Sequence, residues 1–263
     1  MAPPTTRLFE KCELFHKTIL AIAPHPDDET LGCGGFLATA ASRGAKITVL
    51  FLTSGEKGLP CKPPDQARAV REAEARAAMD ALGLNGAEVH FTGFPDGDLA
   101  RHETAIAGYI EGTINRLQPD LILMPHASDP HQDHQIAARC ARRAAERSDS
   151  AILLYEYPAW LWFRAPFVRT RPGLIGWLHY LATGLWGLFV LWRSGLNTRV
   201  DVREALERKQ TAAVCHASQT LPGYCAGKQN LGELAEGRFL KRLVGSRHEY
   251  FRRTSVGGGK VAL

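Results

Sequence analysis

The stretch HPDDE (25–29) places one histidine and three carboxylates directly after an apolar run. Carboxylates this close repel one another unless water surrounds them or a cation lies between them. A turn at a strand end brings position i near position i+3, so His25 and Asp28 can converge while Asp27 points elsewhere. One imidazole and one carboxylate suit zinc or a similar first-row metal. The same acids could instead cap a helix and complement its dipole, and this stretch alone does not decide between the two.

A second cluster of the same kind, PHASDPHQDHQ (125–135), also follows an apolar run. His131 and His134 are three positions apart and share one face of a helical turn, with Asp133 between them. Catalytic zinc sites use three protein ligands and keep an open position for water. One imidazole from this cluster completes the set that the first cluster begins. The two clusters together therefore predict a catalytic metal site.

Both clusters follow strands in an alternating pattern of apolar runs and helical segments. The expected strands are KTILAIA (17–23), KITVLFLT (46–53), AEVHFTGF (87–94), DLILMP (120–125) and AILLYEY (151–157). The expected helices span residues 30–44, 64–83, 102–117 and 131–147. Strands this uniformly apolar are covered on both faces, so the pattern predicts a doubly wound, mostly parallel α/β sheet. In such sheets ligands bind at the carboxyl ends of strands, where both clusters fall.

Composition excludes some classes of function. The 263 residues carry a net charge of +5, but no recognition module accompanies the basic residues, so we expect no nucleic-acid partner. The six cysteines form no CxxC pair and are expected to be reduced thiols. The segment MAPPTTRLFEKCELFHK (1–17) lacks the pattern of a signal peptide, which favours a cytoplasmic location.

HPDDE (25–29) followed by HQDH (131–134) resembles the signature of the PIG-L/LmbE-like family of zinc-dependent N-acetylglucosaminyl deacetylases. The similarity extends to Arg71 and Glu74 in an RxxE pattern, PDGDL (95–99), VDV (200–202) and HASQ (216–219). It implies a single Rossmann-like domain over residues 1–263. It also implies hydrolysis of the N-acetyl group of an N-acetylglucosamine-containing molecule, with Zn²⁺ as cofactor and Fe²⁺ as the alternative.

Residue by residue, the resemblance implies that His25, Asp28 and His134 bind the metal. Asp27 would be the general base that takes a proton from water and returns it to the departing nitrogen.

The resemblance assigns four further side chains. His131 would stabilise the oxyanion, and Asp133 would lie behind it, holding its imidazole and raising its pKa by opposite charge. Arg71 and Asp96 match positions that the family uses for sugar hydroxyls.

The chain departs from the family pattern at two positions, with Gln132 where proline is common and Asp129 where some members have tyrosine. Two other functions stay open, of which only the second is supported by these departures. One is a metal amidase that acts on a non-sugar amide, such as a thiol conjugate or a modified antibiotic. The other is a catalytically silent, membrane-associated scaffold that retains the metal.

An apolar insert at about 160–195 contains GLIGWLHYLATGLWGLFVLW (173–192), which has no charged residue and is flanked by aromatic residues and arginines. Its length could cross a bilayer, but a crossing would separate residues 200–219 from the two clusters. A membrane-interface segment over 160–193 fits better and would place a lipid-linked amino sugar at the inner face of the membrane. A lid or a dimer interface in a soluble enzyme is the alternative. The sequence does not decide the oligomeric state.

Overall fold

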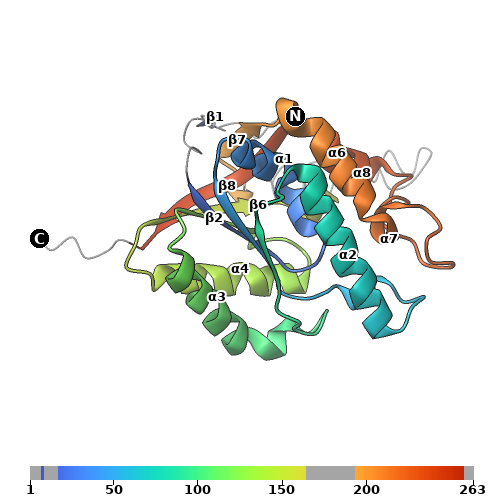
Figure 1. Cartoon of the computed structure of the whole chain (residues 1–263), viewed down its shortest axis with the longest axis horizontal. Coiled ribbons are helices and arrows are strands. Elements are labelled where there is room, and N and C mark those ends of the chain that lie inside the picture. The colour runs from blue at the N-terminus through green and yellow to red at the C-terminus, as the bar shows by residue number, and fades with distance from the viewer. Residues whose placement is uncertain (1–6, 9–16, 164–192, 258–263) are drawn as a thin grey trace, which may run out of the picture.

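The computed structural model describes residues 7–8, 17–163 and 193–257 (Figure 1). Its strands form one sheet in the order β1-β7-β8-β6-β5-β2-β3-β4. The strands are β1 (Arg7–Leu8), β2 (Thr18–Ala23), β3 (Lys46–Phe51), β4 (Glu88–Phe91), β5 (Leu121–Pro125), β6 (Ile152–Tyr157), β7 (Thr198–Asp201) and β8 (His248–Val256). Strands β6, β5, β2, β3 and β4 are parallel neighbours, and β8 runs antiparallel to β6 and β7. The expected mostly parallel α/β sheet is confirmed.

Helices cover both faces of this sheet (Figure 1). The α-helices are α1 (Asp28–Ala41), α2 (Pro64–Leu82), α3 (Glu103–Leu117), α4 (Gln132–Glu146), α6 (Leu206–Cys215), α7 (Ala217–Thr220) and α8 (Arg238–Val244). Short 3-10 turns are η2 (Glu56–Gly58), η3 (Leu99–His102), η4 (Trp160–Phe163) and η5 (Arg203–Ala205). Helices α3 and α4 lie on one face, and α1, α2 and α6 lie on the other.

The buried strand β2 packs against the helices on both faces of the sheet. Ile19 and Ala21 pack into the cluster under α1, α2 and α6, whereas Leu20 and Ile22 pack into the cluster under α3 and α4. Successive side chains of a strand point to opposite faces of the sheet. When helices cover both faces, every side chain of the strand is buried and apolar residues are favoured at every position. This is why β2 reads as a continuous apolar run.

The order of strands reverses at β2. The chain passes from β2 to β3 on one side, and β5 pairs with β2 on the other side, with Ala21 opposite Leu123. The carboxyl ends of β2 and β5 therefore meet at one edge of the sheet, at the switch point where α/β proteins bind ligands. The two polar clusters follow directly after these ends.

Helix α1 is interrupted at Cys33, whose φ of −145° and ψ of 18° are not helical. The backbone N–H groups of Gly35 and Phe36 beyond the break donate to Glu249 at 2.8 and 2.7 Å. The buried Lys209 donates to Glu249 at 2.7 Å and to the carbonyl of Leu31 at 3.0 Å. The ion pair of Lys209 and Glu249 therefore supplies hydrogen-bond partners for backbone groups on both sides of the break in α1. Without the pair these groups would be buried and unsatisfied.

The expectation of reduced cysteines is wrong for one pair. Cys61, in the loop before α2, and Cys225, after α7, form a disulfide with Cα atoms 5.6 Å apart. The fold brings together two loops that are distant in sequence, so spacing could not reveal the pair. Cys33, Cys140 and Cys215 are free thiols in the described part of the chain.

The apolar segment 173–192 lies outside the described residues. Within residues 7–8, 17–163 and 193–257, no helix is both long and apolar enough to span a bilayer.

Candidate metal and catalytic site

The turn after β2 holds the first cluster. The His25 N–H donates to Oδ2 of Asp28 at 3.0 Å, and the same oxygen lies 3.2 Å from Nδ1 of the His25 ring. The Asp28 N–H donates to the His25 carbonyl at 3.2 Å, which closes the turn. The predicted convergence of positions i and i+3 is present.

The second cluster meets the first across the sheet edge. His131 is the N-cap residue of α4, and His134 lies in the first turn of this helix. Nε2 of His134 lies 3.2 Å from Oδ2 of Asp28, and the His25 and His134 ring centroids are 5.6 Å apart. Side chains from two distant strand ends therefore surround one carboxylate oxygen.

This arrangement fits a divalent cation. His134 is fully buried, and the carboxylate oxygens near its ring nitrogens, at 3.2 Å (Asp28) and 3.5 Å (Asp129), do not have hydrogen-bond geometry among the described residues. Leaving a buried polar atom unsatisfied is costly, and a metal ligand bond would satisfy it. One nitrogen each from His25, His131 and His134 also lie within 4.8 Å of one another. The donor set of imidazole nitrogen and carboxylate oxygen is one that zinc accepts.

Carboxylates hold the far side of His25. Its Nε2 lies 3.2 Å from both Oδ2 of Asp133 and Oδ1 of Asp96. Asp133 is held in turn by the N–H of Gly97 at 2.8 Å. Metal-binding histidines commonly donate their second ring N–H to a carboxylate in this way. His25 can therefore face the cation with one nitrogen and Asp133 and Asp96 with the other.

The expected contact between Asp133 and His131 is not what the structure shows. Positions i and i+2 at the start of a helix point in different directions, so Asp133 reaches His25 instead. Nδ1 of His131 has no hydrogen-bond partner among the described residues. Burial lowers the pKa of His131, and the positive charges of His25 and His134 lower it further, so that Asp28 and Asp133 do not raise it above its usual value.

Asp129, which stands where some family members have tyrosine, faces the protein interior. It is fully buried and accepts the N–H of His131 at 3.1 Å and of Trp160 at 2.9 Å. Its Oδ1 lies 3.5 Å from Nδ1 of His134. Asp129 therefore lies behind His134, where it can orient the ring, and does not line the pocket described below.

Asp27 adopts a backbone conformation that non-glycine residues rarely take, with φ of 134°. Its N–H donates to Oε2 of Glu29 at 2.9 Å, and Oε1 of Glu29 lies 3.0 Å from Nε2 of the buried His216. Arg71 donates to Oδ2 of Asp27 at 3.0 Å and also to the carbonyl of Pro26. Strain of this kind persists only where several contacts fix it, and it is concentrated at functional sites.

The electrostatics of Asp27 suit proton transfer. Burial raises its pKa, the Arg71 guanidinium opposes this, and the charge of Asp28 raises it again, to a value of about 6. A carboxyl group with a pKa near neutrality both accepts and returns a proton at physiological pH.

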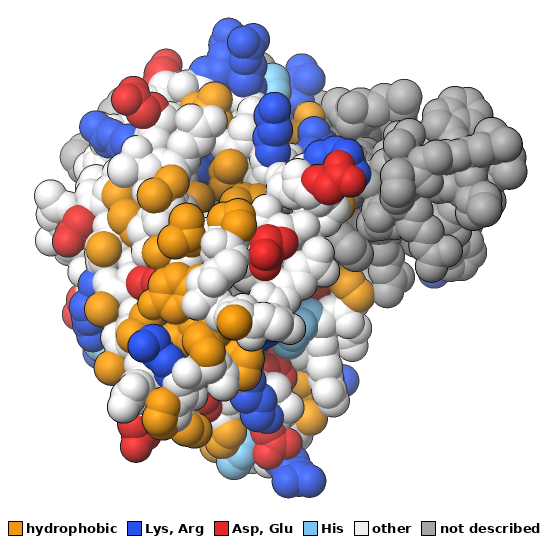
Figure 2. Space-filling view, turned by 90° about the vertical axis from the view of Figure 1, so that its right-hand side faces the viewer, with side chains coloured by type: hydrophobic (Ala, Val, Ile, Leu, Met, Phe, Trp, Pro, Cys, Tyr) orange, Lys and Arg blue, Asp and Glu red, His pale blue; other side chains and the backbone are white. Residues whose placement is uncertain are grey.

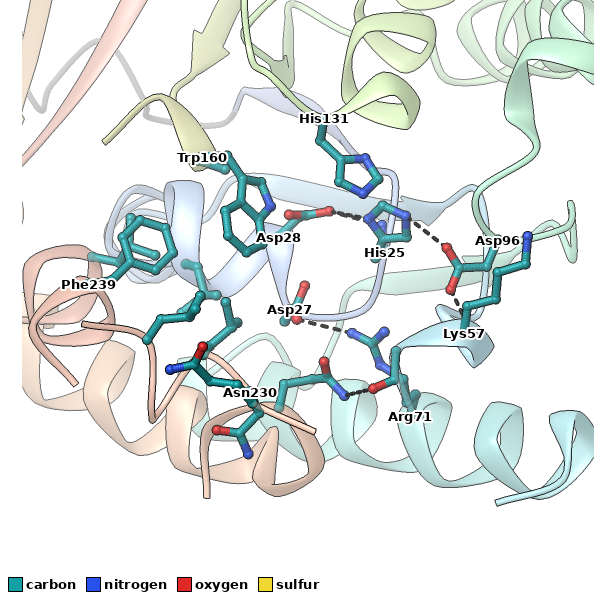
Figure 3. A pocket seen from close by; sticks show the side chains of 18 of the residues that line it. His25, Asp27, Asp28, Lys57, Arg71, Asp96, His131, Trp160, Asn230 and Phe239 are labelled. Atoms are coloured by element: carbon teal, nitrogen blue, oxygen red, sulfur yellow. Dashed lines mark hydrogen bonds and ion pairs between the residues drawn. The ribbon is translucent and has the colours of Figure 1, made fainter. Parts of the chain in front are cut away.

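These residues line a pocket of about 370 Å³ (Figure 3). Asp96, Lys57 and Arg71 lie on one side of the Asp27 and Asp28 carboxylates. On the other side the aromatic rings of Trp160 and Phe239 line the pocket.

Sequence reasoning missed several of the residues that line this pocket: Lys57, Gln219, Lys228, Asn230, Trp160 and Phe239. Gln219 belongs to the HASQ segment and could have been found there. The others stand in no motif that the chain displays.

The chain that carries these two clusters is similar to a known protein family and to several deacetylases. Residues 20–145 match a family model described as "PIG-L: GlcNAc-PI de-N-acetylase". A relative from Escherichia coli, described as an uncharacterized deacetylase, YaiS, is 35% identical over 56% of this chain and 78% of its own length. The 1D-myo-inositol 2-acetamido-2-deoxy-alpha-D-glucopyranoside deacetylase of a Mycobacterium species (strain KMS) is 28% identical over 76% of this chain and 73% of its own length.

Among solved structures, the N,N'-diacetylchitobiose deacetylase from Pyrococcus horikoshii has a similar fold. Its TM-score is 0.65 at 19% identity, and the match covers 90% of this chain and 84% of that one.

Proposed function

The chain belongs to the PIG-L family of deacetylases, and from this premise we propose that it is a metal-dependent hydrolase that removes the N-acetyl group of an N-acetylglucosamine-containing substrate. The observation that carries the proposal is the convergence of His25, Asp28 and His134 beside a pocket that a buried, strained aspartate also lines. The names of the relatives, which include deacetylases of amino sugars, support it.

We assign the cation to His25, Asp28 and His134, and propose Zn²⁺ because two imidazoles and one carboxylate with an open position form a common catalytic zinc set. A bound divalent cation polarises an amide carbonyl and lowers the pKa of water to about 7. Asp133, Asp96 and Asp129 would hold the two imidazoles in the orientation that binding requires.

Asp27 is the proposed general base. Arg71 holds Oδ2 of Asp27 and fixes the direction of this carboxylate. Asp27 takes a proton from the attacking water as a C–O bond forms, and delivers it to nitrogen as the C–N bond breaks. Acid–base assistance of this kind typically contributes about 10²–10⁴-fold in rate.

His131 is the proposed partner of the oxyanion. Because its pKa is lowered, we propose that it acts as a neutral N–H donor to the carbonyl oxygen rather than as a cation. Removing one such donor typically costs about 10²–10³-fold in kcat. Asp96 and Arg71, on the polar side of the pocket, are the proposed contacts of the sugar hydroxyls.

The finer description of the substrate and its location is also a proposal. The sequence favours a lipid-linked amino sugar as the substrate. The enzyme would contact the inner face of the membrane peripherally, through residues 160–193. Flotation of the protein with anionic liposomes tests the membrane contact, and failure of the folded protein to float would remove it.

Acetate release tests the function itself. The zinc-loaded protein is incubated with soluble and lipid-linked N-acetylglucosaminides, and with non-sugar N-acetyl amides as a second panel. We expect acetate from the sugars, released about 10²–10⁴-fold more slowly by the Asp27→Asn variant. Acetate from the second panel alone would indicate a non-sugar amidase, and no acetate from either panel would indicate a catalytically silent protein.

A further inference from the structure

The pocket has two chemically different arms on either side of the proposed metal site. In Figure 3, Trp160 and Phe239 lie on one side of the Asp27 and Asp28 carboxylates, and Asp96 and Lys57 lie on the other side. We refer to these as the apolar arm and the polar arm. The apolar arm is lined by Leu31, Trp160, Leu231, Leu234, Phe239 and Leu243.

The apolar arm is a wall of packed side chains. The rings of Trp160 and Phe239 stack with centroids 5.3 Å apart at an angle of 27°. Leu31, Leu231 and Leu243 belong to the same hydrophobic cluster and are less than a tenth exposed. On the side of the molecule that carries α7 and α8, hydrophobic side chains also gather across the middle of the surface (Figure 2).

Most of the apolar arm comes from parts of the chain that the family match does not include. Only Leu31 lies within residues 20–145, whereas Trp160 belongs to η4 and Phe239 and Leu243 belong to α8. Most of the apolar arm therefore comes from η4 and from the region of α8, which follow the residues that the family model matches.

The polarity of the two arms and the position of the proposed metal ligands between them determine how the substrate can be oriented. Sugar hydroxyls lose water on binding and need hydrogen-bond partners, which the polar arm offers through Asp96, Lys57 and Gln219. The amide must lie beside His25 and Asp28 for hydrolysis. The group on the far side of the amide from the sugar is the acyl group, so it points into the apolar arm.

We propose that the apolar arm binds an N-acyl chain several carbons longer than acetyl, so that the enzyme is an N-deacylase of amino sugars with a preference for longer acyl groups. This inference rests on the proposed function of the same site. A single acetyl methyl group would contact little of a wall that runs from Leu31 to Leu243. Water adds across the C–N bond, so the carbonyl carbon leaves as a carboxylic acid and nitrogen takes the proton as the amine.

The free energy gained by burying acyl methylene groups determines the expected ratio of kcat/KM between the long-chain and acetyl substrates. Each methylene transferred from water to an apolar site gains about 0.8 kcal/mol, which is about fourfold in affinity. A chain of six carbons adds four methylenes to acetyl. We therefore expect kcat/KM to be at least about tenfold higher for an N-hexanoyl than for an N-acetyl substrate, allowing for incomplete burial.

The test uses the zinc-loaded full chain and two series of substrates below their micellar concentrations. One series is methyl glucosaminide with N-acetyl, N-butanoyl, N-hexanoyl and N-octanoyl groups. The other is N-acetylglucosamine with methyl, butyl, hexyl and octyl glycosidic groups. Release of the amine is measured for each. A rise in kcat/KM along the N-acyl series supports the proposal. A flat N-acyl series, or a rise only along the glycoside series, overturns it.

Two wall variants show whether the apolar arm causes the preference. Phe239→Ala and Leu234→Gln should each lower the ratio of kcat/KM for hexanoyl to acetyl by about threefold or more. Leu221→Gln is the matched control, because Leu221 is 55% exposed and does not line the pocket, and it should leave the ratio unchanged. An unchanged ratio in both folded wall variants would overturn the proposal. If no substrate of either series is hydrolysed, the proposed function itself fails.

Discussion

Oδ2 of Asp28 lies 3.2 Å from Nε2 of His134, although the two residues follow different strands of the sheet. Asp28 begins the helix after β2, and His134 lies in the first turn of the helix after β5. The pairing of β2 with β5 brings these two helix starts together. A cation between them would make a dense cluster of carboxylates and imidazoles favourable at a buried position.

The role of Asp27 can be separated from that of its neighbour by substitution. Asp27→Asn keeps the shape of the side chain and the partner of Arg71 but removes the base. We expect kcat to fall by about 10²–10⁴-fold while zinc content stays at the wild-type level. The measurements are acetate release and metal analysis of the same preparation. Parallel loss of metal and activity would contradict this division of roles.

Asp133 should act through His25. Asp133→Asn removes the carboxylate behind Nε2 of His25, and we expect zinc affinity to fall by about 10–100-fold. Competition with a chelator of known affinity measures this. Had Asp133 acted through His131, zinc affinity would be unchanged and only kcat would fall. His90→Asn, at a partly exposed ring that does not line the pocket, is the control.

The fold could be predicted well from the sequence, because its strands are buried on both faces. Each expected strand and helix is present, with ends that differ by a few residues. The helix expected from residue 30 begins at Asp28 because the acids that start it are part of its first turn. The proposed ligands could be found because the same residue types followed two separate apolar runs.

What could not be predicted depends on side-chain direction and on distant contacts. The direction of Asp133 toward His25 is set by the helix start and by the N–H of Gly97. Trp160 and Phe239 meet only when η4 packs against α8. Neither residue stands in a motif, so no local pattern could assign it to the pocket.

The disulfide should contribute to stability under oxidising conditions. Cys61 and Cys225 join two loops that border the pocket, and removing a disulfide of this kind typically costs about 2–4 kcal/mol. We expect a reductant to lower the free energy of unfolding in urea by about this amount. The Cys61→Ser variant should already have the lower value and should not respond to reductant. Equal stability of the wild type with and without reductant would contradict the prediction.

Glu156 should make stability depend on acid pH. Burial alone raises its pKa, but the N–H of Ala127 at 3.0 Å and the Arg252 guanidinium outweigh burial and hold the pKa below its usual value. Its contribution is therefore present above the unfolded-state pKa of about 4.3 and is lost as pH falls through the folded-state pKa.

The Glu156→Gln variant tests this dependence. We expect it to be less stable than the wild type by about 1–3 kcal/mol at pH 7, because Arg142 and Arg252, each 28% exposed, lose their charged partner. The difference should shrink as the pH falls below about 4. Urea denaturation across this range measures it, and a difference that does not change with pH would contradict the assignment.

The most direct test of the central claim is the zinc content of the chain and of two ligand variants. Equilibrium dialysis against buffered Zn²⁺, followed by elemental analysis, should give one tightly bound ion per wild-type chain. Asp28→Asn and His134→Ala, each folded by circular dichroism, should lose that ion at the same free zinc concentration. If both variants retain it with wild-type affinity, the ends of β2 and β5 do not hold a common metal and the proposed site is wrong.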